Sequence, residues 1–90
     1  MIVTVKNHKG HDEATNNHGY ESWLDYWEKG KGRKATKCSN VGCDSNSDLV
    51  GGHVDYNNHI YIVPICKDCN NQGSNFSFKV YSSNLLPLND

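Results

Sequence analysis

The sequence lacks an apolar run long enough to cross a membrane. Its longest such run, residues 60–66, contains a proline and falls far short of the roughly 20 residues that a spanning helix needs. Met1 leads into a short β-prone stretch instead of the charged start, apolar middle and cleavage site of a secretory signal. We therefore expect a cytoplasmic protein that has no membrane partner.

Apolar residues are scarce in the chain as a whole. Only 36% of the 90 residues are hydrophobic, and the mean hydropathy is −0.75. The length fits a single domain over 1–90, and a domain of this size buries only about 60–65% of the surface of its unfolded chain. Small polar domains often need a disulfide, a metal ion or a partner for stability. We expect one of these here.

The net charge of −1 argues against a highly basic nucleic-acid binder, but it hides a segregated pattern. Five basic residues fall within nine positions, with no acid among them and acids on both sides. They are Lys29, Lys31, Arg33, Lys34 and Lys37. We treat them as candidate nucleic-acid contacts, because five phosphate contacts would give a strongly salt-dependent affinity. The alternative is a solvated connector that Gly30 and Gly32 keep flexible.

The first 19 residues are expected to form a strand and a polar loop. Apolar and polar residues alternate over 2–6, which predicts a short strand. Residues 7–19 have almost no apolar side chains and are expected to be a loop. The loop histidines at 8, 11 and 18 are a weak signal for a second metal, and a solvated loop is the preferred interpretation.

A short amphipathic helix is expected at about 22–29, within a segment 20–37 that also holds the basic connector. Its apolar side chains fall on one broad face, Ser22 can cap its start, and the glycines at 30 and 32 would end it. We expect the rings of Trp23, Tyr26 and Trp27 to complete the core. The alternative is an exposed aromatic platform for bases or for a partner protein.

Four cysteines carry the strongest signal in the sequence. Cys38 and Cys43 form a C-x4-C pair, and Cys66 and Cys69 form a C-x2-C pair after a further 22 residues. Four thiolates suit tetrahedral zinc, and a reducing compartment favours metal over disulfides. We predict that these four residues hold one structural Zn²⁺. The alternatives are free or disulfide-paired thiols, or a redox pair at Cys66 and Cys69.

Zinc would supply much of the stability that the small core lacks. A structural zinc ion contributes on the order of 10–16 kcal/mol in finger peptides, against a net stability of roughly 5–10 kcal/mol for a small domain. Metal removal should therefore cost most of the fold over 38–75.

The elements around the cysteines predict a treble clef. Residues 49–55, expected to be interrupted at Gly51-Gly52, would pair with the β-prone stretch 60–65. The first cysteine pair would form a knuckle, and the second would lie on the first turn of a short helix. A last strand is expected at 76–81, within a C-terminal segment 76–90. The fold class is thus a small, metal-stapled α+β treble clef with an N-terminal amphipathic helix and a C-terminal strand.

Two further stretches lie within residues 38–72, namely Gly-Gly-His53-Val and Tyr-Ile-Val-Pro-Ile-Cys66-Lys-Asp-Cys69-Asn70-Asn. Together they resemble the zinc-stapled branch of the HNH (ββα-metal) endonucleases. The resemblance implies that His53 is the general base and that Asn70 lies at the catalytic cation. Gly52 stands where the family has a cation ligand, and Tyr61 stands where it has an asparagine that orients the histidine. Asp55, two residues after His53, is a candidate replacement ligand.

The resemblance therefore implies an HNH-like scaffold with a degenerate catalytic centre, of a kind found in bacterial and phage proteins. We expect a nucleic-acid-binding module, and the degenerate centre argues against catalysis without deciding it. One alternative is an active metal-dependent endonuclease, with His53 as base and a second divalent ion at Asp55 or Asn70. Another alternative is a protein-interaction module of a phage-encoded protein. The near-neutral net charge favours protein interaction over nucleic-acid binding.

Overall fold

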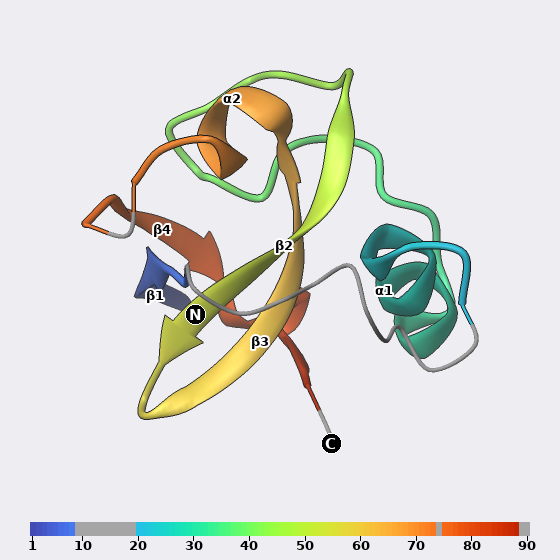
Figure 1. The fold of residues 1–90 in the computed structure, drawn as a ribbon, viewed down its shortest axis with the longest axis horizontal. Helices are drawn as coiled ribbons and strands as arrows, with labels where there is room; N and C mark the ends of the chain where they lie inside the picture. Colours follow the sequence, from blue (N-terminus) through green and yellow to red (C-terminus); the bar gives the residue numbers. More distant parts are fainter. Residues whose placement is uncertain (9–19, 74, 89–90) are drawn as a thin grey trace.

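A single antiparallel sheet forms the centre of the molecule (Figure 1). The structure is a computed structural model that describes residues 1–8, 20–73 and 75–88, so the loop histidines at 11 and 18 lie outside the described residues. In the described part the sheet has five strands in the order β4-β1-β2-β3-β5. The strands are β1 (Ile2–Asn7), β2 (Leu49–Tyr56), β3 (His59–Cys66), β4 (Ser77–Tyr81) and β5 (Leu86–Pro87). The helices are α1 (Trp23–Lys31), α2 (Lys67–Asn70) and the 3-10 turn η1 (Ser82–Asn84).

The hairpin of β2 and β3 is the longest pairing in the sheet. It runs without a bulge from Leu49 opposite Cys66 to Tyr56 opposite His59. Asn57 and Asn58 close it with φ values of 54° and 66°, the left-handed pair that a two-residue type I′ turn requires. The expected interruption at Gly51-Gly52 was wrong, because both glycines stay in register opposite Pro64 and Val63.

Helix α1 occupies the segment for which the sequence predicts a helix. The backbone N–H of Asp25 donates to the Ser22 hydroxyl oxygen at 3.0 Å, which caps the first turn. Gly32 ends the helix in the left-handed region, at φ 71°, and its N–H donates to the Glu28 carbonyl. Gly30 lies inside the helix, so the expectation that it would help to end the helix was wrong.

The inner face of α1 packs on the hairpin. Trp23 and Trp27, which are 7% and 1% exposed, form a core cluster with Ile62 of β3. The phenolic O–H of Tyr26 donates to the Pro87 carbonyl at 3.1 Å and links the helix to β5. The tryptophans therefore act as core, and the alternative of an exposed platform was wrong for them.

Strands β1 and β4 extend the sheet beyond the hairpin. β1 pairs with β4 along its length but with β2 only at Lys6 and Asn7. Their inward side chains join the hairpin in a second core cluster that also contains three of the four cysteines. The buried members of that cluster are Val5, Cys38, Val54, Val63, Ile65, Cys66, Cys69, Phe78, Val80 and Leu85. The cysteine region and the sheet thus share one core.

Figure 1 places α1 beside the hairpin and α2 at the end of the hairpin where β2 begins and β3 ends. The loop that carries the first cysteine pair passes close to α2. Among the described residues, no helix combines the length and apolar character needed to span a membrane.

Candidate metal centre

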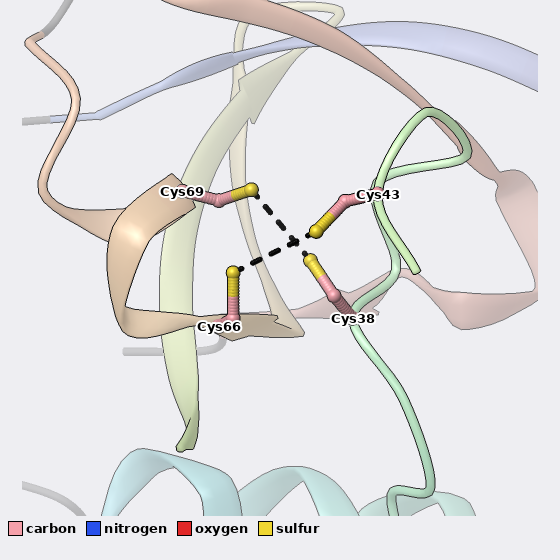
Figure 2. A group of neighbouring side chains, drawn as sticks. All are labelled: Cys38, Cys43, Cys66 and Cys69. Atoms are coloured by element: carbon pink, nitrogen blue, oxygen red, sulfur yellow. Dashed lines mark hydrogen bonds between the residues drawn. The ribbon is translucent and has the colours of Figure 1, made fainter. Parts of the chain in front are cut away.

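Four sulfur atoms converge beside α2. Cys38 and Cys43 come from the loop before β2, Cys66 ends β3, and Cys69 lies in α2. All four Sγ atoms lie within 4.8 Å of one another. Cys38 Sγ is 3.7 Å from Cys69 Sγ, and Cys43 Sγ is 3.8 Å from Cys66 Sγ. In the view of Figure 2 the line that joins Cys38 and Cys69 crosses the line that joins Cys43 and Cys66, as opposite edges of a tetrahedron do in projection.

These distances fit a single tetrahedral metal ion. A Zn–S bond of about 2.3 Å gives a tetrahedron with S···S edges of about 3.8 Å. A disulfide would need an S–S distance of about 2.05 Å, and all four cysteines are free. The disulfide alternative is therefore not observed. The four cysteines can hold one metal ion, and the donor set is consistent with Zn²⁺.

The loop of the first cysteine pair is closed by Asn40. Its carbonyl accepts the backbone N–H of Cys43 at 2.9 Å, and its side-chain oxygen accepts that of Gly42 at 3.0 Å. Among the described glycines only Gly32 has a positive φ, so Gly42 does not need a left-handed conformation to form this loop. The Asn40 amide also donates to Cys69 Sγ at 3.5 Å. One side chain thus shapes the first pair and contacts the second.

The second cysteine pair is positioned by the hairpin and by β1. Cys66 is the last residue of β3 and the extended N-cap of α2, so the chain turns directly from strand into helix. Asn7, which is 2% exposed, donates from its amide to the carbonyls of Cys69 at 3.0 Å and Gln72 at 3.3 Å. β1 therefore anchors a cysteine that lies 62 residues away in the sequence.

Sequence reasoning missed both asparagines. Asn7 had a detectable signal, because it continues the inward positions of Val3 and Val5 in an alternating strand and is the polar one among them. Asn40 lies between two cysteines, where short polar residues commonly bond to the backbone two residues on. Neither signal identifies the carbonyl or sulfur that the amide contacts.

The buried environment opposes ionisation of two of the thiols. Burial raises the pKa of Cys38, and it raises the pKa of Cys69 to about 12. Burial acts on Cys66 in the same direction, but hydrogen bonds from the Cys69 backbone N–H and from neighbouring thiols outweigh it and lower the Cys66 pKa. Four thiolates need a cation among them, because a divalent ion would offset the charge that burial disfavours.

The structure does not gather the candidate catalytic residues into one site. His53 is 3% exposed, and its ring packs edge-on against Trp23 with centroids 4.9 Å apart. A Cβ on Gly52, the preceding residue, would point to the other face of β2, at Ile65 and 3.2 Å from Asn70 Oδ1. Because side chains alternate along a strand, His53 and Asn70 lie at opposite faces of the sheet.

Asp55 lies on the His53 face of β2 but contacts His8, the residue that follows β1. Its Oδ1 is 2.9 Å from His8 Nδ1. Within the described residues, the four cysteines form the one group of three or more His, Cys, Asp or Glu side chains close enough to share an ion. The second divalent ion that the endonuclease alternative places at Asp55 or Asn70 thus has no matching group of His, Cys, Asp or Glu ligands in that part of the chain.

The basic residues divide into two groups. Lys29 pairs with Asp25 at 2.9 Å, and Lys34 lies 3.7 Å from Glu28. Arg33 lies over the Trp27 ring, 4.9 Å from its centroid. Lys31 and Lys37 form no ion pair within the described residues. Acids of α1 therefore neutralise part of the basic run.

Comparisons with protein-family models, with curated proteins and with solved structures find no match to this chain. The metal centre is therefore supported by the geometry of the four cysteines. The resemblance to HNH endonucleases gains no support from these comparisons and stays a hypothesis.

Proposed function

We propose that the protein is a small domain organised around one structural Zn²⁺. The observation that carries this proposal is the pair of opposed sulfur distances, 3.7 and 3.8 Å, which match the edge of a zinc–thiolate tetrahedron. Four protein thiolates fill all four positions and leave none for a substrate, so the role is structural. The ion would join the loop before β2, the end of β3 and α2.

The order of elements supports a treble-clef arrangement for this domain. A cysteine loop, the β2–β3 hairpin and a helix that carries the last cysteine follow one another. Helix α2 is a single turn of four residues, and Cys66 is its N-cap. We therefore propose a reduced treble clef in which the ion supplies much of the cohesion that a longer helix would provide.

Metal content tests the proposal directly. We expect one zinc per chain by elemental analysis, and an intense thiolate-to-metal charge-transfer spectrum after Co²⁺ substitution. Each single Cys→Ser change at 38, 43, 66 or 69 should lower metal affinity sharply. Ser47→Ala, on the exposed part of the same loop, is the control and should bind metal normally. A folded protein that binds no metal, or a Cys66→Ser variant with unchanged affinity, would refute the proposal.

Nucleic-acid binding is a second candidate function. Its support is the group of cations that acids do not neutralise within the described residues, namely Lys31, Arg33 and Lys37. Three phosphate contacts would give a log–log salt dependence of about −2 to −3, less steep than five contacts would give. Fluorescence anisotropy of a labelled oligonucleotide across salt concentrations measures this slope, and a slope near zero would reject the candidate.

Binding is favoured over nuclease activity by the surroundings of His53. A general base must come within hydrogen-bond reach of the attacking water, whereas His53 is 3% exposed beneath α1. The space next to Gly52 is filled by Ile65 and Asn70, so a carboxylate ligand there would displace core atoms. The endonuclease and the protein-interaction module remain alternative hypotheses, and neither has a supporting contact in the described residues.

A further inference from the structure

A pocket of about 310 Å³ lies beside the cysteine cluster, outside the metal site itself. The connector after α1 forms one wall with Arg33 and Lys37, and Ser39, Tyr81 and Asn84 are among the other lining residues. No acidic side chain lines it. The volume is at the lower end of the range for small-molecule sites, about 300–1,000 Å³. The pocket is thus sized for a small ligand and carries positive charge.

Arg33 is held in place at the wall of this pocket. Its guanidinium lies 4.9 Å from the centroid of Trp27, and its Nη2 donates to Asn84 Oδ1 at 2.8 Å. The Trp27 indole N–H donates to the Asn84 carbonyl at 2.8 Å, which fixes the acceptor in turn. A guanidinium has five N–H donors, so most of them stay available to a ligand. Preorganisation lowers the entropy lost on binding.

Hydroxyl and ammonium donors complement Arg33. Ser39 is 6% exposed, and its oxygen accepts a hydrogen bond from the Asn84 amide at 3.4 Å. Its hydroxyl proton has no acceptor in the part of the chain that the structure describes. Lys37 adds an ammonium group that forms no ion pair there. Converging cationic and hydroxyl donors suit an anion with several oxygen acceptors, such as a phosphate.

The rest of the pocket is apolar and partly aromatic. Tyr81 is 50% exposed and Val41 is 44% exposed, and both line the pocket together with Pro64. A large exposed aromatic side chain offers a stacking surface for a planar ring. The pocket therefore presents donors for a phosphate and a surface for a ring, at a size that admits both.

We propose that this pocket binds a nucleoside monophosphate, with the phosphate at Arg33, Lys37 and Ser39 and the base against Tyr81. The ligand is either a free nucleotide or the terminal nucleotide of a strand, since both present the same chemistry. The proposal rests on the zinc-bound fold, because Cys38 and Ser39 of the first cysteine loop form part of the wall.

The test uses the zinc-loaded protein and AMP, followed by changes in amide chemical shifts. We expect saturable binding with a Kd at or below about 1 mM, and weaker binding of adenosine and of inorganic phosphate alone. Lys37→Ala should weaken AMP binding about tenfold, since it removes a charge-assisted contact. Tyr81→Ala should weaken it about fivefold or more through lost stacking. Lys34→Ala is the matched control, because this lysine belongs to the same basic run but lies outside the pocket.

Zinc content and circular dichroism of every variant are measured first, so that a failed zinc domain is distinguished from a failed pocket. Loss of AMP binding in a zinc-loaded, folded Lys37→Ala or Tyr81→Ala variant, with Lys34→Ala unaffected, supports the proposal. A folded zinc protein that does not bind AMP, or equal losses in Lys34→Ala and Lys37→Ala, overturns it and leaves the metal site intact.

Two dinucleotides distinguish the sources of the ligand. If the 5′-phosphorylated form binds more tightly than both AMP and the 5′-hydroxyl form, the pocket takes the end of a strand. If AMP binds most tightly, the pocket takes a free nucleotide. If the phosphorylated and hydroxyl forms bind equally and both bind more tightly than AMP, the proposal is overturned, because the terminal phosphate would then contribute nothing.

Discussion

Asn40 shows how one side chain outside the ligand set can shape the metal site. Its side-chain oxygen accepts the backbone N–H of Gly42, and its side-chain amide donates to Cys69 Sγ at 3.5 Å. An N–H···S hydrogen bond stabilises a thiolate and fixes its direction. Partners of this kind commonly change metal affinity by about 10–100-fold when they are lost.

We predict that Asn40→Ala lowers zinc affinity by about tenfold or more. The change removes the side-chain oxygen that accepts the Gly42 N–H and the amide that donates to Cys69 Sγ, while the backbone carbonyl that accepts the Cys43 N–H remains. Competition with a chromophoric chelator measures the affinity. Asn46→Ala, an exposed asparagine of the same loop, is the control and should bind zinc as the unaltered protein does. Equal affinities for the two variants would show that Asn40 does not position the ligands.

Among the elements, the contact between α1 and β2 depends on Gly51. A Cβ at this position would come within 2.5 Å of the Leu24 backbone nitrogen and would also collide with the backbone of Trp23. Backbone atoms at the start of a helix cannot move aside as a flexible side chain can. The absence of a side chain therefore lets α1 approach the hairpin closely enough to bury Trp23 and Trp27.

Gly51→Ala should destabilise the protein by about 1–3 kcal/mol, which is the usual cost of overpacking. Urea unfolding of the zinc-loaded protein, followed by tryptophan fluorescence, measures the change. Gly73→Ala is the matched control, because a Cβ there would meet nothing within 4 Å. A Gly51→Ala protein as stable as the Gly73→Ala protein would mean that α1 shifts at no cost.

Local patterns predicted the elements better than their assembly. The β2–β3 hairpin, the segment of α1 with its Ser22 cap, and the convergence of the cysteine pairs follow from propensity, capping chemistry and ligand spacing. The placement of β1 between β2 and β4 depends on pairing between distant segments, which alternation within one strand does not encode. The hydrogen bonds from Asn7 to the carbonyls of Cys69 and Gln72 depend on the same pairing of distant segments.

The glycine pair at 51–52 shows the same limit. Two adjacent glycines in a sequence predict a turn or a break, but Gly51 and Gly52 lie inside a continuous strand. They are suited to that place because α1 and the Ile65 side chain occupy the space beside them. This reason exists only once the fold has formed. The resemblance at His53 likewise did not predict that this histidine packs against Trp23 of α1, because that contact depends on how the helix lies on the hairpin.

For the whole molecule, the cysteine cluster is expected to make stability depend on pH in opposite directions with and without metal. In the metal-free protein, burial holds the pKa of Cys38 above its usual value and raises that of Cys69 to about 12. Above the ordinary thiol pKa of about 8.5, the unfolded chain loses protons that the folded chain keeps. The metal-free protein therefore loses stability as the pH rises through this range. The lowered pKa of Cys66 has the opposite effect, but it concerns one thiol, whereas the pKa is raised for two.

In the zinc-loaded protein the ligands are thiolates, so protons compete with the metal. Stability should then fall as the pH drops, because each released ligand takes up a proton. We predict that the metal-free protein loses about 1.4 kcal/mol per pH unit above pH 9 for each thiol that ionises only on unfolding, while the zinc-loaded protein keeps its stability there and loses it in acid. Circular dichroism of the folded fraction from pH 5 to 10, with zinc or with a chelator, measures both trends. Parallel pH profiles for the two forms would mean that the cysteines do not carry the metal, since the sign of the slope follows from whether their charge is compensated.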